Sequence, residues 1–227
     1  MTSSICSLLL VAGLAHGADD KSVGYVAPSN SKEAQAYVPR EGDLVFFDDH
    51  NLFWTALFIW SGSGPPLHMG IVVKKDDGTL AVLEAGPDDT TWVKLLDVET
   101  RLPQFDKDYK GTITIRRCKK ELTQEQSKTL TKYAKAQDGK RYAVIRLLLQ
   151  GTFLRYRGPI RELFLAETNL DRSTWICSEL AVAAGTVAGL MPKTVKSNVT
   201  YPLDLVYNRR HDLSRIWHDA EVWRTKP

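Results

Sequence analysis

Residues 68–84 have the sequence HMGIVVKKDDGTLAVLE and give the clearest indication of how the chain folds. Two runs rich in aliphatic and β-branched residues, 68–73 and 80–84, flank the polar stretch Lys75-Asp-Asp-Gly-Thr79. Such runs are typical of β-strands, and the stretch between them suits a three-residue hairpin loop with Gly78 in the left-handed conformation. The segment therefore predicts an antiparallel hairpin.

The register of this hairpin brings two ionisable residues together. Pairing Lys75 with Thr79 sets Gly70 opposite Glu84, so that His68 and Glu84 become diagonal neighbours on one face. A carboxylate at that place can hold one imidazole nitrogen and leave the other free to address a thiol. A slip of one residue would separate the two side chains.

Further strand-like runs lie on both sides of the hairpin, at residues 43–47, 92–96 and 112–116. Helical patterns occupy residues 52–60 and 123–137, and in the second of these Thr123 and Gln126 match a capping box. Because most strands precede most helices, we predict an α+β domain in which an antiparallel sheet packs against helices.

A third helix is predicted around Cys177. Ser173 or Thr174 can cap it, its apolar residues follow helical spacing, and Gly189 supplies a stop. The first turn of a helix stabilises a thiolate, and the backbone N–H of Cys177 could point at a developing oxyanion. A cysteine on the apolar face of a helix more often fills a core, so the partners His68 and Glu84 carry the catalytic interpretation.

The length and composition favour one domain with one core. The chain has 227 residues, 43% of them hydrophobic and 25% charged, and its formal net charge is +3. Acids and bases are nearly balanced, so no nucleic-acid partner is expected. No run reaches the roughly 18 to 20 apolar residues of a membrane span, so we expect a soluble mature protein without stable membrane insertion.

The N-terminus resembles an export signal. Residues 5–15 are apolar, and Ala15-His16-Gly17 places small residues where a signal peptidase cleaves before Ala18. We predict a signal peptide at 1–17, a polar leader on the surface at 18–40 and the domain at 41–227, in a secreted or periplasmic protein. Residues 1–4 lack Lys and Arg, which leaves a frayed apolar N-terminus as the alternative.

The remaining cysteines and acidic clusters suggest neither a disulfide framework nor a metal site. Beyond the predicted signal peptide the chain has only Cys118 and Cys177, and Cys118 follows a strand where a small buried hydrophobe is common. Asp48-Asp49-His50, or His68, Glu84 and Cys177 themselves, could bind zinc, but no close-spaced ligand pair supports it. We therefore expect no metal and no cofactor.

Several short motifs follow one another in a distinctive order: Gly42-Asp-Leu-Val-Phe-Phe47, Ser61-Gly-Ser63, His68-Met-Gly-Ile-Val72, Val82-Leu-Glu-Ala85, Trp175-Ile-Cys-Ser-Glu-Leu180 and Tyr201-Pro-Leu-Asp-Leu205. Together, over about residues 41–205, they resemble the motifs of YiiX/YaeF-like enzymes, circularly permuted relatives of the NlpC peptidases in the papain-like superfamily. Papain-type chains run Cys before His, whereas here His68 and Glu84 precede Cys177. The resemblance implies a circularly permuted papain-like fold with the nucleophile Cys177 at a helix N-terminus, His68 as base and Glu84 as third member.

Two regions depart from the family pattern. Many relatives have Tyr-Asp where this chain has Gly139-Lys-Arg-Tyr142-Ala143, so Tyr142 is a candidate to lend a hydroxyl near the oxyanion, and Ser178 is a second candidate for substrate or oxyanion contacts. Residues 145–172 match no family motif and contain Arg146, Arg155, Arg157, Arg161 and Arg172. They suggest either a lid that meets carboxylates or anionic lipid, or a solvated basic face.

These observations predict a secreted cysteine hydrolase that cleaves an amide bond through a thioester, with an ionised Glu84 and a peptide or muropeptide-like substrate. A lipid acyltransferase or thioesterase on the same fold is the alternative enzyme, favoured by the aromatic run at 52–60 and the arginines. That aromatic run could instead pack a helix on the sheet. A non-catalytic binding module is the alternative outside enzymes.

Overall fold

The computed structural model describes residues 21–28, 34–149, 166–208 and 210–225. Within them, eight strands form one sheet in the order β2-β1-β10-β7-β3-β4-β5-β6, in which every pair of neighbours is antiparallel. Its strands are β1 (Tyr25–Pro28), β2 (Gln35–Ala36), β3 (Leu44–Asp48), β4 (His68–Lys74), β5 (Leu80–Ala85), β6 (Val93–Asp97), β7 (Thr112–Arg116) and β10 (Glu221–Arg224). A small parallel pair joins β8 (Arg141–Tyr142) to β9 (Thr174–Trp175).

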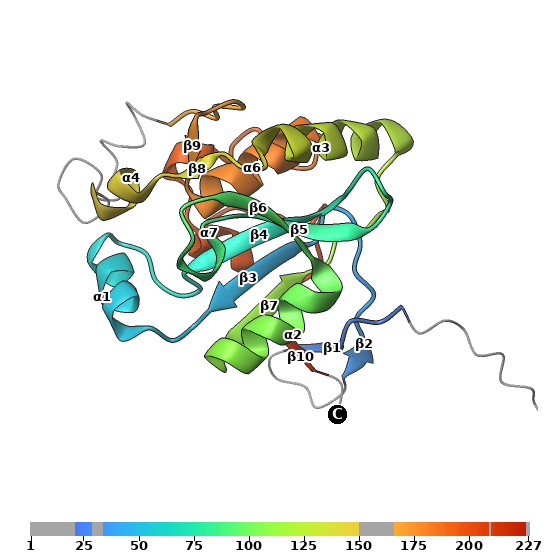
Figure 1. Ribbon diagram of the computed structural model, residues 1–227, viewed down its shortest axis with the longest axis horizontal. Helices are drawn as coiled ribbons and strands as arrows, with labels where there is room; N and C mark the ends of the chain where they lie inside the picture. Colours follow the sequence, from blue (N-terminus) through green and yellow to red (C-terminus); the bar gives the residue numbers. More distant parts are fainter. Residues whose placement is uncertain (1–20, 29–33, 150–165, 209, 226–227) are drawn as a thin grey trace, which may run out of the picture.

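Helices cover both faces of this sheet (Figure 1). The helices of the described chain are α1 (Leu52–Trp60), α2 (Val98–Tyr109), α3 (Gln124–Gln137), α4 (Val144–Leu148), α6 (Cys177–Val187) and α7 (Pro202–Val206). Side chains alternate between the two faces of β3: Leu44 and Phe46 join the core beneath α3 and α6, while Val45 and Phe47 join the core beneath α2. The α+β prediction with an antiparallel sheet is thus confirmed for the described residues.

The hairpin that dominates the sequence analysis has the predicted register. Gly70 pairs with Glu84, the backbone N–H of Lys75 donates to Thr79 O at 2.8 Å, and Gly78 has a φ of 86°. The helix at 52–60 and the capping box of Thr123 and Gln126 at the start of α3 are also present.

The start of α6 differs from the prediction. Ile176 is its N-cap residue, and Thr174 belongs to β9, so neither Ser173 nor Thr174 caps the helix. The backbone N–H of Ile176 donates instead to the side chain of Glu179 at 3.3 Å. The short pairing of β8 with β9 draws residues 174–175 into extended structure, which shifts the helix start to Cys177.

The N-terminal segment takes part in the sheet. The predicted signal peptide lies outside the described residues, but β1 and β2, which fall in the predicted polar leader, extend the sheet beyond β10. Val26 and Tyr37 are fully buried there, so this part of the leader does not merely lie on the surface. In the described ranges, no helix combines the length and the apolar character needed to cross a membrane.

Candidate functional site

His68 and Glu84 meet at the end of the central hairpin. His68 is the first residue of β4, and its Nε2 lies 2.8 Å from Glu84 Oε2. The His68 side chain is 21% exposed and the Glu84 side chain is fully buried. Because Nε2 faces the carboxylate, Nδ1 is the nitrogen that remains for another partner.

Gly70 makes room for this contact. A Cβ at residue 70 would lie 2.8 Å from Glu84 Cγ, 2.5 Å from Val82 Cγ1 and 2.8 Å from the backbone oxygen of Leu83. Contacts this short between heavy atoms are strongly repulsive, so the Glu84 side chain can cross the strand toward His68 only over a residue without a side chain.

A buried arginine completes the group and was not identified from the sequence. Arg101 of α2 donates from Nε to Glu84 Oε1 at 2.8 Å and from Nη2 to Glu84 Oε2 at 3.0 Å. Its Nη1 donates to both carboxylate oxygens of Asp88, at 2.8 and 3.0 Å. Burial favours the neutral acid, but the hydrogen bond from His68 and the charge of Arg101 together hold the pKa of Glu84 below its usual value.

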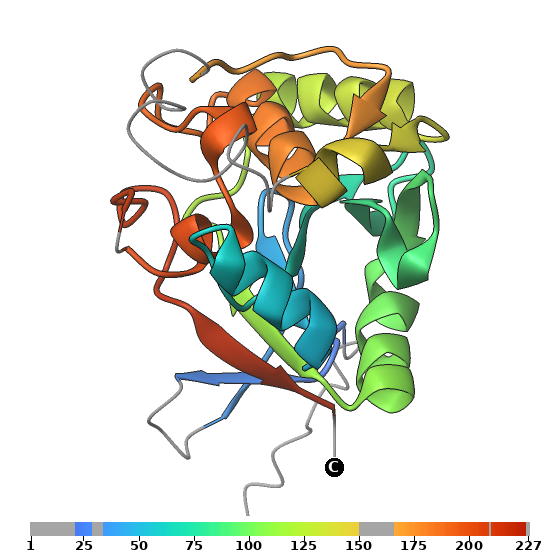
Figure 2. The ribbon, with the colours of Figure 1, turned by 90° about the vertical axis from the view of Figure 1, so that its left-hand side faces the viewer.

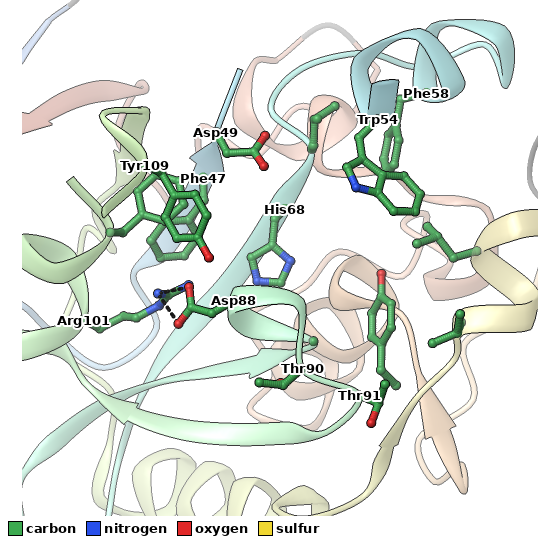
Figure 3. Close-up of a pocket in the computed structure, with 16 residues that line it drawn as sticks. Phe47, Asp49, Trp54, Phe58, His68, Asp88, Thr90, Thr91, Arg101 and Tyr109 are labelled. Atoms are coloured by element: carbon green, nitrogen blue, oxygen red, sulfur yellow. Dashed lines mark hydrogen bonds and ion pairs between the residues drawn. The ribbon is translucent and has the colours of Figure 1, made fainter. Parts of the chain in front are cut away.

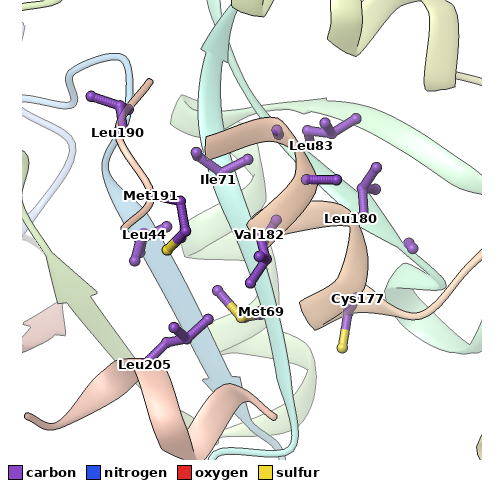
Figure 4. Close-up of a cluster of buried hydrophobic side chains, with 14 of the residues drawn as sticks. Leu44, Met69, Ile71, Leu83, Cys177, Leu180, Val182, Leu190, Met191 and Leu205 are labelled. Carbon is purple, nitrogen blue, oxygen red and sulfur yellow. The ribbon is translucent and has the colours of Figure 1, made fainter. Parts of the chain in front are cut away.

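Cys177 is the first residue of α6, which packs against β4 and β5, and it is 3% exposed. It lies at the edge of the apolar cluster formed by this helix and the sheet (Figure 4). Burial opposes the charge of the His68 imidazole, but the charge of Cys177, a hydrogen bond to Cys177 and the bond to Glu84 raise the pKa of His68 from 6.5 to about 10. The structure therefore brings Cys177, His68 and Glu84 together, as the sequence analysis expected.

Tyr142 also lies near Cys177, because β8 pairs Tyr142 with Trp175, two residues before the cysteine. Burial raises the pKa of the Tyr142 hydroxyl well above its usual value, and the negative charges of Cys177 and Glu179 raise it further. Ser178 follows Cys177 in the first turn of α6 and is buried, with 3% exposed. Contacts of Tyr142 and Ser178 with a substrate stay predictions.

Of the arginine-rich segment, Arg155, Arg157 and Arg161 lie outside the described residues. Arg146 of α4 binds the first turn of α6, with Nη1 at 2.8 Å from Glu179 Oε2 and Nη2 donating to Thr174 O at 2.6 Å. Arg146 thus supports the position of Cys177, whereas Arg172 lies 3.3 Å from Glu167.

The described residues offer no cluster of three or more His, Cys, Asp or Glu side chains suited to a metal ion. His50 lies 3.3 Å from Asp48 on the surface, and Asp49 accepts a hydrogen bond from the backbone of Asn51. Cys118 and Cys177 are both free thiols, and Cys118 is buried, with Sγ at 3.2 Å from Lys120 O.

A pocket of about 320 Å³ opens beside His68 (Figure 3). Its walls come from α1, α2, α4, the loop after β5 and Tyr142, and they are mostly aromatic and aliphatic. An apolar pocket of this size with a few polar groups is typical of a small-molecule or side-chain binding site.

The fold and site define an α+β protein with a buried His–Glu–Arg network beside a cysteine at a helix N-terminus. No protein-family model matches the sequence, and no curated protein matches it. Among solved structures, the chain is similar to metalloprotein yiiX from Escherichia coli O157:H7, DUF1105, with 20% sequence identity, a TM-score of 0.44 and 67% of each chain covered.

Proposed function

We propose that this protein is a cysteine hydrolase that cleaves an amide bond, on a circularly permuted papain-like fold. The observation that carries the proposal is the hydrogen bond from His68 to Glu84 next to Cys177 at the start of α6, and Cys177 and Glu84 together raise the pKa of His68. An imidazole held by a carboxylate on one nitrogen and coupled to a thiol is the arrangement that activates a cysteine nucleophile.

In the proposed reaction, the sulfur of Cys177 attacks the amide carbonyl carbon and His68 takes up the thiol proton. The imidazolium then gives this proton to the leaving nitrogen as the C–N bond breaks, which leaves a thioester on Cys177. Water attacks the thioester, His68 accepts its proton and returns it to the sulfur, and the carboxylic acid product leaves. Glu84 stays ionised throughout and fixes the orientation of the imidazole.

Replacing Cys177 with Ala or Ser tests this proposal. In the protein that begins at Ala18, and so lacks Cys6, we expect the loss of turnover on peptide-like amides and of labelling by iodoacetamide, because the thiolate is the reactive species. Cys118→Ala is the matched control and keeps both, because desolvation raises the pKa of the Cys118 thiol and so disfavours its thiolate. Undiminished labelling of Cys177→Ala, or an acyl adduct on Cys118 by mass spectrometry, would show that the nucleophile is wrong.

A metal-dependent function fits these residues poorly, although yiiX is described as a metalloprotein. Both carboxylate oxygens of Glu84 already accept hydrogen bonds, from Arg101 and His68. A cation placed there would also face the buried guanidinium of Arg101, and like charges repel strongly at low dielectric. We therefore expect activity to survive a chelator.

The second candidate function is acyl transfer or thioester hydrolysis on lipid. It is favoured by the exposed apolar side chains of α1 and α4, among which Leu52 is 84% exposed and Ile145 75%. Turnover of a phospholipid ester in vesicles, without turnover of peptide amides or muropeptides, would select this candidate. An unreactive Cys177 with neither activity would instead indicate a binding module.

The proposal includes export from the cytoplasm and cleavage before Ala18, on the strength of the apolar run at 5–15. The mass of the protein recovered from the culture medium or periplasm tests it. A cell-wall peptide or another peptide-like amide is the substrate class that this location favours.

A further inference from the structure

The pocket beside His68 is formed by two groups of side chains on either side of the imidazole (Figure 3). Trp54 and Phe58 of α1 lie on one side, and Phe47 and Tyr109 lie on the other. Val144 and Leu147 of α4 add to the wall next to α1, and α1 and α4 lie on the same side of the molecule in both ribbon views (Figures 1 and 2).

His68 faces this pocket, whereas Cys177 is not among the described residues that line it. In the proposed reaction, the imidazolium must come within about 2.6–3.2 Å of the leaving nitrogen to give up its proton. The group attached to that nitrogen then lies on the His68 side of the cleaved bond. The pocket is the space available for it there.

The charges of the pocket exclude one class of leaving group. Two carboxylates, Asp49 and Asp88, line it, and the Asp49 carboxylate points toward its centre in Figure 3. Arg101 is the one guanidinium among the described lining residues, and its donors already bind Glu84 and Asp88. His68, the other cationic group that faces the pocket, is bonded to Glu84. An anionic ligand would therefore meet the Asp49 carboxylate without an unpaired cation to balance its charge.

We propose that this pocket binds the leaving-group side of the substrate. It accepts an uncharged aromatic or branched aliphatic group on the leaving nitrogen and rejects a group that carries a carboxylate. This inference rests on the proposed function, and it narrows the peptide-like substrates to those with a large apolar group directly after the cleaved bond. Trp54 and Phe58, four residues apart on one face of α1, form the wall of the pocket that selects this apolar group.

A neutral probe and an anionic probe that share one skeleton test the proposal in the Cys177→Ala protein, where no turnover interferes. N-benzylacetamide carries an acetyl group on a benzylamine, and 4-(acetamidomethyl)benzoate adds only a carboxylate to the ring. We expect N-benzylacetamide to bind and to shift the NMR signals of the Trp54 indole and the His68 ring. The benzoate should bind about tenfold more weakly, and Asp49→Asn should narrow this gap.

Trp54→Ala and the more conservative Trp54→Leu should weaken N-benzylacetamide binding, by about tenfold for Ala. Trp60→Ala is the matched control, because Trp60 belongs to the same helix, is 69% exposed and does not line the pocket. Melting temperatures close to that of the parent protein show that each variant is folded.

Three results would overturn the inference: no binding of N-benzylacetamide, equal binding by the Trp54 and Trp60 variants, or equal binding of the two probes. Because these measurements use a protein without the thiol, they are independent of the nucleophile test. Turnover that survives in Cys177→Ala would refute the proposed function even if the pocket binds its probe as expected.

Discussion

Arg101 is the residue on which the position of Glu84 depends. It has 2% of its side chain exposed and lies between the fully buried Glu84 and the partly exposed Asp88. A buried carboxylate without a cation would be costly, since removal of one member of a buried pair typically costs about 3–5 kcal/mol. Arg101 therefore acts as a positioning residue: it keeps Glu84 charged and directed at His68.

Arg101→Met should lower kcat/KM by about tenfold and move the acid limb of its pH profile to higher pH. Without the guanidinium the pKa of Glu84 rises, so the ionised form is lost at a higher pH than in the parent. Arg101→Lys should restore part of the activity. Arg117→Met, which breaks the pair with Glu221 far along the sheet, is the control and should leave the acid limb of the profile unchanged. An unchanged acid limb in Arg101→Met would show that Arg101 does not keep Glu84 ionised.

The protonation of His68 depends on Cys177. In Cys177→Ala both the charge and the hydrogen bond of the cysteine are lost, so the pKa of His68 should fall from about 10 toward its usual value near 6.5. Titration of the imidazole C–H signals by NMR measures this change. Cys118→Ala should keep the high value, and a high value in both variants would mean that Glu84 alone accounts for it.

At the scale of the element, the β4–β5 hairpin provides the geometry of the site. Gly70→Ala should destabilise the protein by about 1–3 kcal/mol, because the new Cβ would overlap the Val82 side chain and the Leu83 backbone. It should also reduce kcat/KM, since Glu84 crosses the strand at this position.

Gly78→Ala is the matched control for that substitution. Its Cβ would have no atom within 4 Å, and the cost comes only from the positive φ of 86°, about 1 kcal/mol. We expect a lower melting temperature with kcat/KM preserved. If Gly70→Ala behaves in the same way, Glu84 does not need the space above residue 70.

The elements that could be predicted are those whose signal is local. Alternating apolar residues and a turn around Gly78 define the hairpin, and the capping box of Thr123 and Gln126 defines the start of α3. Helix α2 was missed because Pro103 and many charged residues obscure the apolar spacing of Val98, Leu102 and Phe105. Pairs such as β8–β9 are two residues long and depend on contacts distant in sequence, which no local pattern reveals.

The same distinction applies to the candidate site. His68 and Glu84 could be placed together because a hairpin register fixes them, and Cys177 could be placed at a helix start. Arg101 and Asp88 could not, because their meeting depends on how α2 packs on the sheet and on a left-handed Asp88 with a φ of 49°. Basic residues in a polar helix otherwise look like a solvated surface.

At the scale of the whole molecule, the N-terminal strands complete the sheet. Deleting residues 1–40 removes β1, β2, the buried Val26 and the Tyr37 hydroxyl that donates to buried Asp43 at 2.9 Å. We expect this deletion to cost about 3 kcal/mol or more, from the lost apolar burial alone. Deletion of residues 1–20 is the comparison, and equal melting temperatures of the two truncated proteins would mean that residues 21–40 contribute nothing to stability.

Strands β1 and β10 have a further consequence for chain connectivity. Tyr25 pairs with Arg224, so the first and last strands of the described chain run side by side. A short linker could join Arg224 to Tyr25, and new chain termini could be placed between the exposed Lys120 and Glu121. Every strand of the sheet would then keep its present neighbours. In that rearranged gene product Cys177 would be made before His68 and Glu84. The order in which these residues leave the ribosome is thus independent of their positions in the folded protein.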